Sequence, residues 1–343
     1  MLSSTRHHHS FPLRRNTVKK LITYLFIFAI ALNLLTPGAS SYAAEKVFIR
    51  IQTSTLGGVW FPVASGMSAI INAKVPGVLV TATTGHGVRN IRRIETGKDL
   101  MGFTISAAAA AAKAGAGPFK KVGKVKHVMS FASMYPSPIQ LVTPADAGIK
   151  KVPDLIGKRL IPHKRGGPLE LAVRRILGEY GINYKKITAA GGRINHVGYP
   201  EMVIAYKDRQ VDMMALMLPV PAPPVLNMQT SRRVSILGLD ESVVDKLVKK
   251  FPGYNKEKIP AGSYKGTTSD AWAIGVSHMV VIRDSVSNEL AYKMAKAVFG
   301  NLKVLKKFHP VLKRHLSVKS AAKNLPLPLH PGAARYYKEK GAL

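Results

Sequence analysis

The stretch from Val47 to Pro62 most constrains what the chain can fold into. It reads V-F-I-R-I-Q-T-S-T-L-G-G-V-W-F-P, an alternating apolar run followed by hydroxyl residues, two glycines and the start of a helical pattern. This order predicts a strand, a glycine loop and a helix N-terminus. Glycines let a ligand approach the backbone, and a helix start offers unpaired N–H groups and a positive dipole end. The stretch is therefore either a site for a carboxylate or phosphate, or a tight turn without a ligand.

The same order of strand, glycine loop and helix recurs along the chain. A strand over 78–83 leads into Thr84-Gly85-His86-Gly87 and a helix over 88–95. A strand over 100–105 precedes an alanine-rich helix over 106–114, with Ser106 as the expected N-cap. Two more strands are expected over 126–134 and 139–143, joined by the bridge Tyr135-Pro136-Ser137-Pro138.

The alternation restarts after Pro153, with a strand over 159–162, a loop over 163–168 and a helix over 169–180. A polar loop is expected over 252–270, before a long strand over 271–282. Repeated units of this kind predict the α/β class, with parallel sheets and helices on both faces. The restarts predict two lobes, residues 44–140 with 271–343 as lobe 1 and residues 141–270 as lobe 2. Glycine loops at strand ends would line a ligand cleft between the lobes.

The first 43 residues predict an export signal. Five basic residues and no acid precede the apolar run from Leu21 to Leu35, and the small residues Ser41-Tyr42-Ala43 follow. This pattern favours a signal peptide cleaved after Ala43 over an uncleaved membrane anchor. We therefore expect a soluble protein in the periplasm. The chain has no cysteine, which excludes disulfides, thiol nucleophiles and thiolate metal sites.

The charge of the chain limits its partners. Without the five basic residues of the leader, 46 Lys and Arg face 18 Asp and Glu, a formal net charge of +28. So basic a surface suits nucleic acid, an anionic membrane surface or an anionic solute, or it only maintains solubility. Nucleic acid is not expected, because the protein is predicted to be exported and has neither an arginine-rich arm nor an RNP-type aromatic motif.

Seven stretches, in order and across nearly the whole mature chain, resemble the TAXI-type solute receptors of TRAP transporters. They are T-S-T-L-G-G-V-W-F-P (53–62), K-V-P-G-V-L-V-T-A-T-T-G-H-G-V-R-N-I (74–91), M-Y-P-S-P-I-Q-L-V (134–142), D-L-I-G-K-R-L (154–160), F-P-G-Y (251–254), I-P-A-G-S-Y-K-G (259–266) and L-P-L-H-P-G-A-A-R-Y-Y-K-E-K-G (327–341). The resemblance implies a two-lobe, hinged periplasmic binding protein of the type II-like class. It would hand a small organic anion, such as a glutamate-like carboxylate, to a TRAP-type membrane permease.

The chain departs from the family pattern in both lobes. Where the family's first-lobe loop reads Gly-Gly-Ser-Val-Glu-Asn, this chain has Gly-His-Gly-Val-Arg-Asn at 85–90. Where the second-lobe loop reads Gly-Ser-Gly-Thr-Glu, it has Gly-Gly-Pro-Leu-Glu at 166–170, so the hydroxyls are gone and Pro168 lacks a backbone donor. We expect the second lobe to hold its ligand differently, with Lys164 and Arg165 as possible sources of charge.

Loop positions and the resemblance together select the candidate ligand-binding residues. They are Ser54, Thr55, Gly57, Gly58, Trp60, Gly85, His86, Gly87, Asn90, Ser106, Tyr135, Arg165 and Gly167. Trp60 either stacks on the ligand or closes the core, and Tyr135 is either a ligand contact or a buried hinge residue. For Asn90 a cleft-facing amide is weighed against a structural cap. For His86 and Arg165 a carboxylate contact is weighed against plain exposure.

Other functions are less well supported by the sequence. Acids are scarce and the eleven histidines show no H-x-x-x-H or H-E-x-x-H pattern, so an enzyme is not expected, nor a metal or cofactor. A periplasmic sensor that presents its closed form to a membrane signalling protein remains an alternative. A basic protein that adheres to anionic polymer or lipid is a third. A monomer in transient contact with the permease is the expected working state.

Overall fold

A computed structural model describes residues 47–54 and 59–343 of the chain. The predicted leader and the candidate residues Thr55, Gly57 and Gly58 lie outside the described residues. Among the helices of the described part, none is long and apolar enough to cross a membrane.

The first group of elements follows the predicted alternation. Strand β1 (Val47–Gln52) pairs in parallel with both β2 (Val78–Thr83) and β3 (Met101–Ile105). Helices α2 (Trp60–Lys74), α3 (Gly87–Glu95) and α4 (Ser106–Ala114) follow these strands in turn. The alternating residues Ile49 and Ile51 of β1 are almost fully buried, as a strand covered by helices requires. The short 3₁₀ helix η1 (Gly117–Phe119) follows α4.

A second group of elements repeats this pattern. Strand β5 (Arg159–Ile161) pairs in parallel with β6 (Arg193–Ile194) and β7 (Met213–Met217). The 3₁₀ helix η2 (Val152–Leu155) precedes β5, and β8 (Val234–Ile236) pairs with the long strand β4. The helices of this group are α5 (Pro168–Glu179), α6 (Tyr184–Ala189), α7 (Tyr199–Lys207), α8 (Pro223–Met228) and α9 (Glu241–Lys250).

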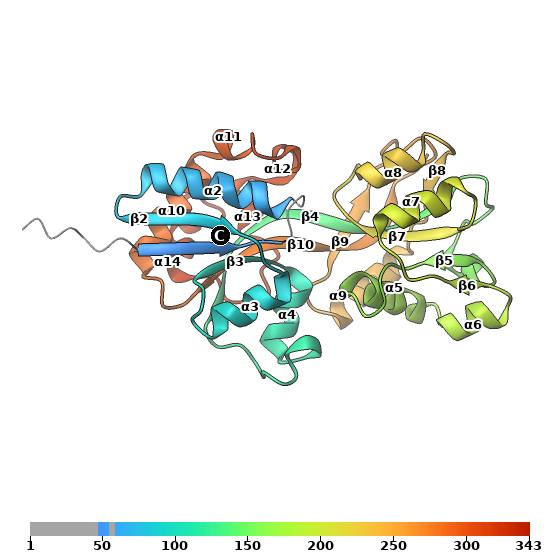
Figure 1. Cartoon of the computed structure of the whole chain (residues 1–343), viewed down its shortest axis with the longest axis horizontal. Coiled ribbons are helices and arrows are strands. Elements are labelled where there is room, and N and C mark those ends of the chain that lie inside the picture. Colours follow the sequence, from blue (N-terminus) through green and yellow to red (C-terminus); the bar gives the residue numbers. More distant parts are fainter. Residues whose placement is uncertain (1–46, 55–58) are drawn as a thin grey trace, which may run out of the picture. The chain divides into compact units, whose positions relative to one another are not determined.

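Two long antiparallel strands join the groups. They are β4 (Val128–Pro144) and β10 (Ala271–Arg283), and the strand order is β2-β1-β3-β10-β4-β7-β5-β6. Figure 1 shows both strands running from the sheet beneath α2 to the sheet beneath α7 and α8. The prediction of two separate strands over 126–143 was wrong. Pro136 and Pro138 are tolerated within β4, because this part pairs only with β10 and leaves its other edge open.

A further strand lies in the segment predicted as a polar loop over 252–270. Strand β9 (Asn255–Ile259) pairs antiparallel with β10, from Ala271 opposite Ile259 to Gly275 opposite Asn255. Its sequence N-K-E-K-I has too few apolar residues to be recognised as a strand. Charged side chains are usual on edge strands, because they discourage pairing with other chains.

The C-terminal segment packs on the first group of strands. It forms α10 (Asn288–Gly300), α11 (Leu302–Leu305), α12 (Pro310–His315), α13 (Val318–Ala321) and α14 (Pro331–Glu339). Buried residues of α10 and α14 belong to the same hydrophobic core as those of β1 and α2. The buried His330 caps α14, since its Nδ1 accepts the Gly332 N–H at 3.2 Å and its Nε2 donates to the Val286 carbonyl at 2.9 Å.

Candidate ligand-binding site

The carboxyl ends of β1 and β2 lie side by side and bring together several predicted residues. The Thr53 N–H and its hydroxyl both donate to the Thr83 carbonyl at 2.8 Å. One step further, the Gly85 N–H donates to the Ser54 carbonyl at 3.4 Å. Thr53 and Ser54 are thus held to Thr83 and to the β2–α3 loop (residues 84–86) by hydrogen bonds. That the two loops form one ligand site stays a prediction.

Asn90 fixes this arrangement from inside. Its side chain is fully buried, and its Nδ2 donates to the carbonyls of Thr53 and Phe103, both at 2.8 Å, with a longer contact to Gln52. Its Oδ1 accepts the His86 N–H at 3.0 Å. These bonds give Asn90 a structural role, which the sequence had weighed against a cleft-facing amide. A direct ligand contact by Asn90 stays a prediction.

The start of α3 comes close to its neighbours at Gly87. A Cβ on this residue would lie 3.2 Å from Trp60 Cη2 and 3.5 Å from Thr104 Oγ1. Within the part of the chain that the structure describes, no side chain caps α3, and the His86 N–H is already bonded to Asn90. The N–H groups of Gly87, Val88 and Arg89 have no acceptor within the helix, because they belong to its first turn. They form a set of donors at the positive end of the helix dipole.

Three polar side chains that the sequence analysis missed lie at the same ends of β1, β2 and β3. Within the described residues, the buried Oγ1 atoms of Thr83 and Thr104 have no hydrogen-bond partner in the protein. Gln52 is only 7% exposed, and its Oε1 lies 3.1 Å from the position of a Cβ on Gly85. All three residues stand at or one position before the ends of their strands. In parallel sheets ligands bind at the carboxyl ends of strands, and that rule would have identified them.

Trp60 and Tyr135 belong to one aromatic cluster with His278 of β10, in which Tyr135 is buried and the other two side chains are half-buried. The Trp60 indole N–H donates to His278 Nδ1 at 2.8 Å, and the Tyr135 ring stacks on the imidazole with centroids 4.4 Å apart. Because Nδ1 accepts, the neutral imidazole carries its proton on Nε2, which donates to Ser137 Oγ at 2.9 Å. Desolvation lowers the pKa of His278 to about 3 and raises the pKa of Tyr135. Their ligand roles stay predictions.

Ser106 has a different role from the predicted one. The N-cap of α4 is Ile105, and Ser106 is the first residue of the helix. Its hydroxyl donates to the Gly253 carbonyl at 2.6 Å and accepts the Ser277 N–H at 2.9 Å. The N-cap prediction was therefore wrong, because a distant segment uses the hydroxyl. The serine connects α4 to β10 and to the turn before β9.

The loop before α5 contains the remaining candidates, Arg165 and Gly167. Arg165 is exposed, and Gly167 is the N-cap of α5 with its N–H bonded to the Lys164 carbonyl at 3.2 Å. The buried Glu170 accepts the Gly166 N–H at 3.2 Å and pairs with Arg174 at 3.0 Å. A carboxylate of the protein therefore already lies at the start of α5. This makes the loop a weaker site for a ligand anion than the start of α3.

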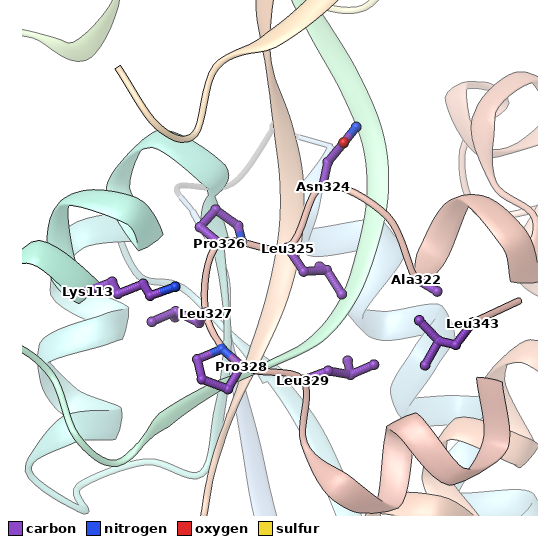
Figure 2. A pocket seen from close by; sticks show the side chains of 9 residues that line it. All are labelled: Lys113, Ala322, Asn324, Leu325, Pro326, Leu327, Pro328, Leu329 and Leu343. Carbon is purple, nitrogen blue, oxygen red and sulfur yellow. The ribbon is translucent and has the colours of Figure 1, made fainter. Parts of the chain in front are cut away.

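Two adjoining cavities lie away from these residues. Their volumes are about 460 and 780 Å³, and both are lined by Lys113, Asn324, Leu325 and Pro326. Figure 2 shows the smaller one, bordered by Lys113 and the leucines and prolines of segment 324–329. None of the predicted site residues that the structure describes lines either cavity. Within residues 47–54 and 59–343, no three His, Asp or Glu side chains are grouped as metal ligands.

The strand order, the two long connecting strands and the helix starts at strand ends define a two-lobe α/β fold, which is the fold of periplasmic solute-binding proteins. The chain belongs to the NMT1-like family, whose sequence model matches residues 51–341. The match covers every element from the end of β1 to the end of α14.

Two solved structures are similar to the chain, with little sequence in common. A TctC solute binding protein from Polaromonas is 12% identical with a TM-score of 0.50, and the match covers 86% of this chain and 98% of that one. The periplasmic aliphatic sulphonate binding protein SsuA from Escherichia coli is 15% identical with a TM-score of 0.47, with 85% and 83% covered. At these identities the first similarity shows the fold alone.

Proposed function

We propose that the protein is the extracytoplasmic solute receptor of a TRAP-type transporter of the TAXI kind. It binds a small organic carboxylate and delivers it to a membrane permease. The family and the fold support a solute-binding protein, and the seven stretches that resemble TAXI receptors support the finer assignment. No enzymatic step is part of this function.

The observation that carries the proposal is the uncapped start of α3. Gly87 lies beside the buried hydroxyl of Thr104, which has no hydrogen-bond partner among the described residues. The N–H groups of Gly87, Val88 and Arg89 have no acceptor within the helix. A carboxylate would accept hydrogen bonds from these groups and would be stabilised by the helix dipole. The adjacent residues Ser54, Trp60 and Gly85 complete the first-lobe part of the site.

Closure of two lobes provides the working step. We assign residues 44–140 and 271–343 to lobe 1 and residues 141–270 to lobe 2, with β4 and β10 as the hinge. The solute is bound first by lobe 1, and lobe 2 then closes over it by hinge bending. The Arg165–Gly167 segment contributes from lobe 2. The closed form presents a surface to the permease in a transient contact.

Export and charge fit this role. A signal peptide cleaved after Ala43 directs the receptor to the periplasm. There it acts as a monomer. The formal charge of the remaining chain, +28, raises the local concentration of anions and speeds their capture. Because salt screens this field, we expect the association rate for a carboxylate to fall as ionic strength rises.

A matched pair of variants tests the α3 site. Gly87→Ala and Gly87→Pro add a Cβ in the same place, but only proline removes the N–H. Proline suits this first helical position, and the extended backbone of His86 (φ −159°, ψ 130°) accepts a following proline. Calorimetric titration with valerate and glutarate should show about ten-fold weaker binding by the proline variant than by the alanine variant, as expected for one charge-assisted hydrogen bond. Equal affinities would contradict the proposed site.

A further inference from the structure

The end of α4 and the loop after it form a cluster of lysines without an acid. Residues 113–126 read K-A-G-A-G-P-F-K-K-V-G-K-V-K. The lysines, all of them exposed, are Lys113, Lys120, Lys121, Lys124 and Lys126. Among the described residues, no hydrogen bond or ion pair engages any of their ammonium groups. This part of the surface therefore carries a concentrated positive charge that the protein itself does not neutralise.

The loop is fixed by its own backbone. Phe119 is fully buried, and its carbonyl accepts the N–H groups of Val122 at 2.9 Å and of Gly123 at 2.8 Å. The Val125 N–H donates to the Ala112 carbonyl of α4 at 3.1 Å. The lysines are thus attached to a preformed turn, so a partner that binds them has little backbone to order.

One carboxylate contacts the loop, but it does not bind a lysine side chain. Glu95 of α3 accepts the backbone N–H groups of Lys126 at 3.0 Å and of His127 at 2.9 Å. These bonds hold the end of the loop against α3. The ammonium groups of the loop remain available to anions outside the protein.

An apolar side chain stands among these charges. Val122 is 48% exposed, with Lys121 before it and Gly123, at φ 82°, after it. An exposed valine between lysines suits the boundary of a lipid bilayer, where the methyl groups enter the interface and the ammonium groups stay at the level of the phosphates. An acidic protein would need a matching pocket for the valine, whereas a bilayer yields to it.

We propose that the lysine loop (residues 120–126) docks the protein on an anionic lipid bilayer. Its lysines pair with lipid phosphates, and Val122 enters the interface. Clusters of four to eight basic residues are typical of proteins that bind anionic lipids, and each basic residue near such a surface raises the affinity about five-fold. Docking of this kind keeps a receptor beside the membrane that contains its permease. It requires no solute and so goes beyond the proposed function.

A second lysine cluster provides a matched control. Lys303, Lys306 and Lys307 surround Val304, which is 45% exposed. This cluster lies at α11, whose Leu305 belongs to the core that contains α2, whereas buried residues of α4 belong to the other core of the first group of strands. Figure 1 shows α11 and α4 on opposite sides of β1 and β3. The two clusters thus share their composition but not their location.

Co-sedimentation with lipid vesicles tests the proposal. The exported protein, in the form left by leader cleavage, is mixed with vesicles of phosphatidylcholine or of phosphatidylcholine and phosphatidylglycerol in equal parts. We expect binding only to the anionic vesicles, and weaker binding at higher salt. A triple variant with Lys120→Gln, Lys121→Gln and Lys124→Gln should bind at least about ten-fold more weakly. The control with Lys303→Gln, Lys306→Gln and Lys307→Gln should stay within about two-fold of the wild type. Equal melting temperatures would show that both variants are folded.

Tryptophan fluorescence locates the contact. Val122→Trp and Val304→Trp each introduce an indole at a half-exposed valine, and the wild-type spectrum is subtracted to remove the signal of the two native tryptophans. On anionic vesicles the emission from position 122 should shift to shorter wavelength, because the indole enters the interface. The emission from position 304 should not shift.

Three results would overturn the inference. The first is a wild-type protein that does not bind anionic vesicles. The second is equal weakening by the two triple variants, which would make adhesion a property of the net charge instead of the loop. The third is an unshifted emission from position 122 while the protein is bound. Each leaves the carboxylate receptor intact, because no solute takes part in the experiment.

Discussion

Glu257 of β9 is half-buried opposite Ala273, and within the described residues no hydrogen bond or ion pair engages its carboxylate. This leads to a prediction about stability that needs no ligand. Burial raises the pKa of Glu257 from 4.5 to about 7 in the folded protein. The folded state therefore holds the proton more tightly than the unfolded chain does. The resulting contribution to stability is present below about pH 4.5 and is lost as the pH rises through 7. One pKa unit corresponds to about 1.4 kcal/mol, so the loss has an upper limit of about 3 kcal/mol.

The substitution Glu257→Gln removes this dependence and nearly keeps the shape of the side chain. Relative to the wild type, the variant should gain up to about 3 kcal/mol between pH 4.5 and about pH 8. This corresponds to a gain of about 5 °C in Tm for a chain of this size. Differential scanning calorimetry at both pH values measures it, with Asp208→Asn as the control for a lost exposed charge.

The neighbouring titratable groups do not produce the same signal. The pKa of Lys256 is raised by Glu241 and Asp245, and all three are unchanged in the variant. On the adjacent strands, the pKa of His278 is already lowered to about 3 and the pKa of Tyr135 is raised. A Tm difference between variant and wild type that is the same at both pH values would refute the reasoning, because Glu257 would then titrate as an exposed acid.

Three further predictions concern the buried polar groups. Ser106→Ala leaves the Gly253 carbonyl and the Ser277 N–H without their partner, and it should lower the free energy of unfolding in urea by about 1–3 kcal/mol. Ser106→Thr keeps a hydroxyl and should lower it less. Asn90→Ala removes the bonds that hold the β2–α3 loop and should cost at least about 3 kcal/mol in the same assay. The imidazole NMR signals of His278 should not shift between about pH 5 and 8, and a midpoint near 6.5 would contradict its neutral state.

Local sequence signals were sufficient to predict the helices and strands that have a clear apolar periodicity. Alanine favours helices and Gly115 adopts the left-handed conformation with φ 64°, so α4 ends where the sequence predicted. Met213 and Met214 belong to the apolar run V-D-M-M-A-L-M-L, and both are fully buried in β7. Strands β4 and β9 could not be predicted equally well. A strand whose edge is unpaired tolerates prolines or many charges. Which edges are unpaired depends on partners that are distant in the sequence, so the local pattern does not show it.

The candidate site was predictable only in part for the same reason. The glycines at 85 and 87 mark a helix start in the sequence, and the structure places them beside Ser54 and Trp60. The partner of Trp60, His278, lies 218 positions away, and no local pattern connects the two residues. Glu257 appears in the sequence as one charge among several in a polar segment. Only the pairing of β9 with β10 reveals that it lacks a partner.

The most direct test of the central claim is a thermal-shift screen of the purified protein against small solutes. The panel contains mono- and dicarboxylates, amino acids, neutral sugars and amines without a carboxylate. If the protein is a receptor for organic carboxylates, members of the first two groups should raise Tm in a saturable manner at moderate salt. Stabilisation by sugars or plain amines alone, with no response to any carboxylate, would contradict the proposed function.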